Sequence, residues 1–212
     1  MFAAIASLEP VKTRIIDFQT QRESMQMRMY QNDPTSNFGE SFITFAIDAP
    51  ESYRLEDSAA EFVFFIDPQP TKRELGCNGY QIVASQLMPS ISCLGWANQV
   101  IDCVQLAMCG DWPGRDLQDF REFLQACQSR QLSFSIVDFD WAEPLQLLNQ
   151  PLAGFRTLYV VILGDAFPDL NSCAALVNAI ETSNPNIVEL RFGNEIRPKA
   201  PCNALLLGEM HS

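Results

Sequence analysis

The segment Leu158 to Gly164, LYVVILG, decides how the chain can fold. It is short and uncharged, is rich in β-branched and aliphatic side chains, and is followed directly by Asp165. A run of this kind predicts a strand buried on both faces, and such strands are usually parallel and covered by helices. We therefore expect an α/β fold built around this segment.

The sequence after this strand predicts a helix and then another strand. Asp169 and Asn171 can cap a helix over residues 170–183, in which apolar positions recur at helical spacing. Asn184-Pro185 closes the helix before the next predicted strand, Ile187 to Phe192. Together these segments predict a strand-helix-strand unit.

Residues 11–67 predict a β-rich region. Met25 to Met29 alternates strictly, and residues 42–47 and 61–66 are runs of β-branched and aromatic side chains separated by turn signals. We expect hairpin or meander pairing here. The two aromatic runs end alike, in Ile47-Asp48 and Ile66-Asp67, and proline follows each, which indicates strand boundaries rather than functional sites.

The domain organisation is expected to be α+β overall, with two lobes, and whether the lobes share one core is left open. Residues 1–75 form the predicted β-rich N-terminal lobe, and residues 76–212 form a lobe of strand-helix units with a mostly parallel sheet. The proline-rich segment Pro68 to Arg73 is interpreted as the connection between the lobes. Tyr80 to Leu87 predicts a strand, and Ile91 to Val100 is left open between a helix and a loop.

From about residue 100 onward, similar segments recur along the chain. Four apolar segments end at aligned polar residues separated by 29, 25 and 29 residues: Asp111, Asp140, Asp165 and Asn194. Helix candidates lie between them: Leu117 to Arg130, residues 145–149 and residues 170–183. A strand-helix unit recurring at this interval is typical of a solenoid or a small parallel sheet.

The string Asn186 to Asn194, NIVELRFGN, follows a predicted helix at this spacing. With that spacing, residues 100–196 resemble leucine-rich repeats of the ribonuclease-inhibitor type. The resemblance implies a short solenoid with a concave strand face that binds a partner protein. It implies no catalytic residues.

The charge balance favours some partners and disfavours others. The chain has 26 acidic and 14 basic residues, a net charge of −12, which repels nucleic acid and anionic membranes and attracts a basic protein. The simpler interpretation is that the charge serves solubility. No segment approaches the roughly 20 apolar residues that a membrane-spanning helix needs, and the N-terminus lacks the pattern of a signal peptide, so we expect a cytoplasmic protein.

The cysteine and histidine content argues against metal or cofactor chemistry. The seven cysteines show no CxxC pairing, which favours free thiols in a reducing compartment. The single histidine is His211, next to the last residue, so histidine-based metal sites and Ser-His or Cys-His catalysis have no obvious base. We expect no metal and no cofactor.

Carboxylates at the carboxyl ends of the predicted strands are the candidate site, because parallel strands bring such residues to one edge of the sheet. Aromatic residues stand beside them in Asp111-Trp112 and Asp140-Trp141, as in binding faces for basic partners. The alternative is that each Asp caps the next helix and each Trp covers the sheet end. The predicted partner-binding residues are Asp111, Trp112, Asp138, Asp140, Trp141, Asp165, Phe167 and Glu195.

A second use of the same carboxylates is enzymatic. Ile136 to Asp140, IVDFD, resembles the first motif of haloacid-dehalogenase-type phosphatases. The resemblance implies an Mg²⁺-dependent phosphohydrolase with Asp138 as nucleophile and Asp140 handling the leaving-group proton.

The function expected from the sequence is therefore non-enzymatic: an acidic protein-binding module for a basic partner. A bacterial inhibitor or immunity protein, or a secretion chaperone, fits such a chain. The phosphohydrolase is the alternative, and the oligomeric state is left open.

Overall fold

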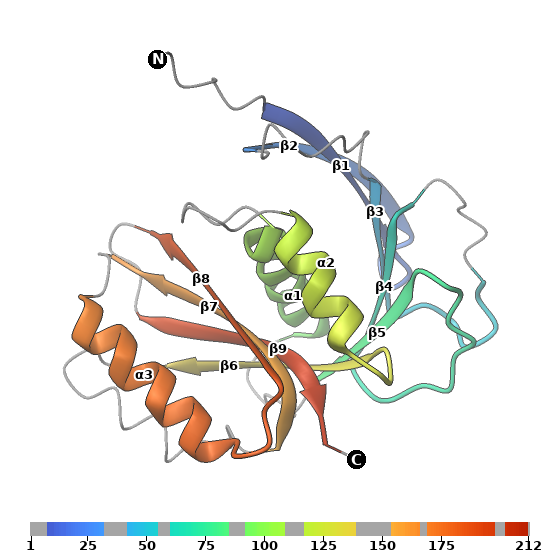
Figure 1. The fold of residues 1–212 in the computed structure, drawn as a ribbon. Coiled ribbons are helices and arrows are strands. Elements are labelled where there is room, and N and C mark those ends of the chain that lie inside the picture. The colour runs from blue at the N-terminus through green and yellow to red at the C-terminus, as the bar shows by residue number, and fades with distance from the viewer. Residues whose placement is uncertain are drawn as a thin grey trace. The chain divides into compact units, whose positions relative to one another are not determined.

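The computed structural model describes residues 8–31, 42–54, 60–84, 92–108, 117–138, 154–165, 169–197 and 202–211. These residues form an α/β fold with nine strands and three helices (Figure 1). The chain divides into two compact units, Met1–Val104 and Gln105–Ser212. Whether the N-terminal and C-terminal lobes are separate domains stays a prediction.

The first unit contains a mixed array of five strands. In spatial order these are β2 (Arg22–Gln31), β1 (Leu8–Asp17), β3 (Phe42–Ile47), β4 (Phe62–Asp67) and β5 (Gly79–Ala84). β2 contains the predicted alternating run, and it forms an antiparallel hairpin with β1, a strand that the sequence analysis did not single out. β1, β3, β4 and β5 run parallel to one another, so the expected meander is wrong for them. Parallel pairing requires the chain to return between strands, and the long connections allow this.

The aromatic run of β4 is buried on both faces of this array. On one face, Phe64 stacks between Phe45 and Tyr80, with ring centroids 5.4 and 5.7 Å away. On the other face, Val63 and Phe65 pack in a cluster that takes in Tyr53 and Leu75, residues of the connectors after β3 and β4. These connectors therefore lie against the sheet, where they position the site described below.

Helix α1 (Cys93–Met108) contains the boundary between the two units. The first of the four recurring apolar segments starts at Val104 and ends at Asp111, and the sequence predicts it as a strand. This prediction is wrong for residues 104–108, which form the end of α1. Val100, Val104 and Ala107 are fully buried, so the helix is apolar over much of its surface. A short apolar run does not distinguish a buried helix from a buried strand, which explains the error.

The second unit combines four strands with two further helices. In chain order these are α2 (Leu117–Ala126), β6 (Gln131–Asp138), β7 (Phe155–Gly164), α3 (Leu170–Ser183), β8 (Glu189–Ile196) and β9 (Asn203–Met210). The spatial order of the strands is β6-β9-β7-β8. β7 and β8 are parallel, and β9 is antiparallel to both β6 and β7.

The strand-helix-strand unit predicted around Leu158 to Gly164 is confirmed as β7, α3 and β8. The Asp169 carboxylate caps α3 by accepting from the backbone N–H groups of Asn171 at 2.8 Å and Ser172 at 2.9 Å. Asn184 ends the helix, and its side-chain oxygen accepts from the Phe155 N–H at 2.8 Å. This bond ties the end of α3 to the start of β7.

The two faces of β7 carry different helices (Figure 1). Leu158, Val160 and Ile162 pack with Leu176 and Ile180 of α3. Tyr159 points to the opposite face because successive strand residues alternate, and its ring meets Phe120 and Phe123 of α2 edge-on. The second unit is therefore a helix-sheet-helix sandwich.

The predicted solenoid of strand-helix repeats is wrong. Its first repeat contains a helix in place of a strand, and the last strand of the chain, β9, lies antiparallel between β6 and β7. A solenoid would place successive strands side by side and parallel. The short helix predicted over residues 145–149 lies outside the described residues.

A buried carboxylate joins the turn after α2 to the sheet of the second unit. Glu209 on β9 is 3% exposed and accepts from the backbone N–H groups of Gln128 and Ser129. Arg156 on β7 forms an ion pair with it at 2.9 Å. Burial raises the pKa of Glu209, but the hydrogen bonds from Ser129, Gln128 and Arg156 outweigh it and hold the pKa below its ordinary value of 4.5.

This network predicts acid-sensitive stability in the second unit. A carboxyl group with a lowered pKa in the folded state stabilises the fold above its unfolded pKa, and this contribution disappears as the pH falls through the folded pKa. We expect the free energy of unfolding to fall below about pH 4.5. Glu209→Gln should lower it by about 1.5–3 kcal/mol at pH 7. The free energy of unfolding of the variant should also fall less steeply at low pH, as measured by urea unfolding followed by circular dichroism. If the variant lost as much stability at low pH as the unchanged protein does, Glu209 would not be the group that causes the acid sensitivity.

Candidate functional site

The structure brings some of the predicted site residues to one edge of the second unit. Strand register pairs Asp138 of β6 with Asn203 of β9, Asn203 with Leu163 of β7, and Leu163 with Glu195 of β8. Asp165 follows β7 by one residue. Asp138, Asp165 and Glu195 thus lie at the same edge, and Asp138 and Asp165 are exposed.

The remaining members of the predicted site, Asp111, Trp112, Asp140, Trp141 and Phe167, lie outside the described residues. A binding role for the whole set stays a prediction. With its amide nitrogen facing Asp138, Asn203 donates to that carboxylate at 3.1 Å. Within the described part of the chain, no group of three or more His, Cys, Asp or Glu side chains is arranged to hold a metal ion.

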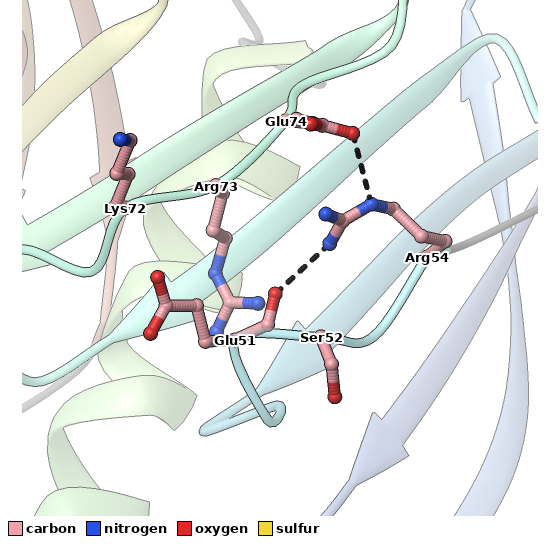
Figure 2. A pocket seen from close by; sticks show the side chains of 6 residues that line it. All are labelled: Glu51, Ser52, Arg54, Lys72, Arg73 and Glu74. Carbon is pink, nitrogen blue, oxygen red and sulfur yellow. Dashed lines mark hydrogen bonds and ion pairs between the residues drawn. The ribbon is translucent and has the colours of Figure 1, made fainter.

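The first unit holds a pocket of about 510 Å³ between the connectors that follow β3 and β4 (Figure 2). We call this the cation pocket, and its lining residues are Glu51, Ser52, Arg54, Lys72, Arg73 and Glu74. The two connectors leave the carboxyl ends of β3 and β4 and cross the sheet face that carries Val63 and Phe65. The volume lies within the range of about 300–1,000 Å³ typical of small-molecule sites.

One wall of this pocket is fixed by a buried ion pair. Arg73 donates to both carboxylate oxygens of Asp67 at 2.7 Å, and each side chain is only 2% exposed. Gln81 on β5 donates to the same carboxylate at 2.7 Å. Such a bidentate pair fixes orientation as well as charge. We call Asp67 and Arg73 the clasp.

The clasp also holds the connector after β3. Arg73 donates to the backbone carbonyls of Ala49 and Pro50, the latter at 3.0 Å. Its guanidinium lies over the Phe65 ring, 4.8 Å from the centroid. One arginine thereby joins β4, its own connector and the connector after β3.

The rest of the pocket is more exposed and more weakly paired. Arg54 forms an ion pair with Glu74 at 3.3 Å, with side chains 47% and 85% exposed, and it donates to the Glu51 carbonyl at 2.9 Å (Figure 2). Lys72 is exposed and makes no ion pair with any other described residue. The lining residues carry three cations and two carboxylates, in a chain whose net charge is −12.

The carboxyl edge of β1 and β3 has the opposite character. The Asp17 carboxylate accepts from the backbone N–H groups of Gln19 and Thr20. Asp48, whose φ of 49° is left-handed, accepts from the Gln19 side chain at 3.1 Å. Burial is the main cause that raises the pKa of the Cys93 thiol; a hydrogen bond with Gln19 opposes it, and Asp48 and Asp17 add to it. Unlike the cation pocket, this edge does not favour an anion.

The sequence interpretation missed Arg54, Lys72 and Arg73, because it assigned Pro68 to Arg73 to a connection between lobes. A usable signal was present. Three basic residues fall in the connectors of two strands that both end in Ile-Asp, in an acidic chain with only 14 basic residues. Their joint position depends on the parallel register of β3 and β4, which the sequence interpretation did not predict.

The fold and the pocket define an α/β protein with mixed strand pairing and a ligand-sized cavity beside parallel strands. Solved structures show which fold this is. An FtsZ dimer from M. jannaschii matches with a TM-score of 0.52 and 11% identity, over 79% of this chain and 62% of that one. The chain therefore has an FtsZ-like fold.

Two further structures match less well. CetZ from Methanosaeta thermophila has a TM-score of 0.49 and 12% identity, over 82% of this chain and 53% of that one. CetZ2 from Haloferax volcanii, solved as a GTPγS-bound protofilament, has a TM-score of 0.45 and 10% identity, over 81% and 56%. The chain spans less than two thirds of the length of each of these proteins. No protein-family model matches the sequence, and no curated protein matches it.

The FtsZ-like fold corrects the functional predictions made from sequence. The resemblance to leucine-rich repeats is wrong, and with it the partner-binding solenoid and the inhibitor, immunity-protein or chaperone role. The expectation of a non-enzymatic protein is likewise overturned by the likeness to FtsZ. The phosphohydrolase motif at Asp138 and Asp140 receives no support from this fold. None of the described helices is long and apolar enough to cross a membrane.

The clasp predicts a large difference between two arginines of the same pocket. Arg73→Met leaves the Asp67 carboxylate buried without its partner and should lower the free energy of unfolding by about 3–5 kcal/mol. Arg54→Met removes only an exposed ion pair and should cost less than about 1 kcal/mol. Urea denaturation of both variants measures this difference. Equal, small losses would show that the clasp does not hold the first unit together.

Proposed function

We propose that this chain binds a nucleotide and holds its phosphate groups in the cation pocket. The observation that carries the proposal is the position of Arg54, Lys72 and Arg73 around one cavity beside parallel strands. Phosphate oxygens are the ligands that such groups recognise. The pocket volume of about 510 Å³ suits a small phosphorylated molecule such as a nucleotide.

The three cations have different parts in this proposal. Arg73 is fixed in the clasp and keeps the wall in place. Lys72 supplies a compact positive charge that is not committed to another described residue. Arg54 is held only by an exposed ion pair, so its guanidinium can turn to a phosphate group and bind two oxygens at once.

The carboxylates of the pocket are compatible with a nucleotide that arrives with Mg²⁺. Magnesium is usually bound by one or two carboxylates together with substrate phosphates and waters. Glu51 lines the cation pocket and is exposed, which makes it the carboxylate suited to this role. We therefore expect binding to be stronger with Mg²⁺ than with a chelator.

GTP is the nucleotide to test first, because its three phosphate groups match the three cations around the pocket. Phosphate release from GTP, measured in the same samples, tests whether binding leads to hydrolysis. ATP and GDP serve as comparison ligands for the base and for the number of phosphates.

Replacement of Lys72 tests the proposal directly. Lys72→Ala should weaken GTP binding about 10-fold or more, because it removes one charge-assisted contact to phosphate. Lys12→Ala makes the same chemical change on β1, outside the pocket, and should leave the affinity within about twofold. Isothermal titration calorimetry at low salt measures both. No binding of GTP at about 1 mM, or an equal loss in the two variants, would refute a phosphate site in this pocket.

A further inference from the structure

A second cavity, of about 280 Å³, lies beside the cation pocket in the first unit. Arg54 and Glu74 line both cavities, so the two share a boundary. We call this second one the apolar cavity, and its lining residues are Arg54, Val63, Phe65, Glu74, Leu75, Gly76, Asn78 and Gly79.

The walls of the apolar cavity are unlike those of the cation pocket. Val63, Phe65 and Leu75 belong to the core cluster beneath the connectors, so this side is hydrophobic and well supported. Gly79 allows the turn to close on itself, because a Cβ there would lie 3.3 Å from the Gly76 nitrogen. The result is a small space with a hydrophobic side formed by Val63, Phe65 and Leu75. Its polar side is formed by Arg54, Glu74 and Asn78, and such a space suits the flat ring and the polar edge of a base.

The boundary between the cavities has one firm part and one weak part. Phe65 lines the apolar cavity and Arg73 lines the cation pocket, and the Arg73 guanidinium lies over the Phe65 ring, 4.8 Å from its centroid. The ion pair between Arg54 and Glu74 is exposed, and water competes with both partners. This ion pair can therefore open while the stacked wall stays in place.

We propose that the bound nucleotide spans both cavities, with its phosphates in the cation pocket and its base in the apolar cavity, and that the Arg54–Glu74 ion pair opens to admit it. The proposal rests on the nucleotide-binding function proposed above. Arg54 exchanges the Glu74 carboxylate for phosphate oxygens, which are equally suited to a guanidinium. Glu74 is then free to accept from N–H groups on the base. The ion pair acts as a switch between an empty and an occupied site.

The test compares a ligand that has a base with one that lacks it. GTP and inorganic tripolyphosphate are titrated by calorimetry into the full chain with Mg²⁺, and circular dichroism confirms that each variant is folded. We expect GTP to bind about tenfold more tightly than tripolyphosphate, because only GTP fills the apolar cavity.

Gly76→Leu fills the apolar cavity. A Cβ at this position meets only the Asn78 side-chain oxygen, at 3.6 Å, so the added side chain has room to start. The variant should lower the GTP affinity to the level of tripolyphosphate and leave tripolyphosphate binding unchanged. Leu75→Ala removes part of the apolar wall and should lower GTP affinity alone, by about fivefold.

Glu74→Gln and Glu51→Gln form a matched pair, because each removes one carboxylate from the cation pocket. Only Glu74 pairs with Arg54 through its side chain. In titrations without Mg²⁺, where Glu51 has no metal ion to hold, Glu74→Gln should therefore raise tripolyphosphate affinity at least about threefold more than Glu51→Gln does. Equal gains in tripolyphosphate affinity in the two variants would show that Arg54 does not exchange the Glu74 carboxylate for phosphate.

The outcomes separate the two proposals. If neither GTP nor tripolyphosphate binds, the proposed function fails and this inference fails with it. If both bind with equal affinity, or if Gly76→Leu and Leu75→Ala leave GTP binding unchanged, the base does not occupy the apolar cavity. In that case the inference is overturned, while phosphate binding in the cation pocket stands.

Discussion

The buried ion pair between Asp67 and Arg73 is the constraint on which the site in the first unit depends. Removing two charges from water costs several kcal/mol for each ion, and mutual attraction offsets this only when the geometry is good and the other polar groups are satisfied. Here both carboxylate oxygens are bonded by Arg73, Gln81 adds a further donor, and Arg73 reaches two backbone carbonyls. The ion pair therefore joins β4, the connector after β4 and the connector after β3.

The Asp67–Arg73 ion pair explains why the two connectors form a site. Parallel strands require the chain to return to the opposite end of the sheet, and the returning segments after β3 and β4 run over the face that carries Val63 and Phe65. Arg73 holds the two segments together through buried contacts, and the exposed ion pair of Arg54 and Glu74 joins them at the surface. A rigid wall and a weak boundary thus lie side by side, which suits a pocket that must hold its shape and still admit a ligand.

In the second unit, a different buried carboxylate holds a connecting segment against the sheet. Glu209 is buried, and its oxygens are satisfied by backbone N–H groups after α2 and by Arg156. The Thr157 hydroxyl accepts from the Glu209 N–H at 3.3 Å and contacts the Cys127 thiol at 3.2 Å. In both units, one buried carboxylate fixes a connecting segment against the sheet.

The sequence predicted the elements with strong local signals and failed where distant segments decide the structure. Residues 158–164 and the capped helix after Asp169 carry their own pattern, so β7 and α3 were predictable. Val104 to Met108 is apolar without a clear period, and only packing decides that it is helical. The insertion of β9 between β6 and β7 depends on pairing across the unit, which no local pattern encodes.

The candidate site was missed for a related reason. Arg54 and Lys72 are 18 positions apart in the sequence, and they line one cavity only because β3 and β4 are parallel and in register. The carboxylates at the strand ends were predicted as the site instead, because a carboxylate that follows an apolar run can be recognised from the sequence alone. Position in the fold, rather than residue type, separates the two candidates.

Hydrogen–deuterium exchange with and without GTP and Mg²⁺ tests most directly the claim that the two connectors form one ligand-binding unit. We expect slower exchange in residues 49–54 and 69–79 when GTP is present, and unchanged exchange in α3 of the second unit. Slowed exchange elsewhere, with both connectors unaffected, would contradict this claim.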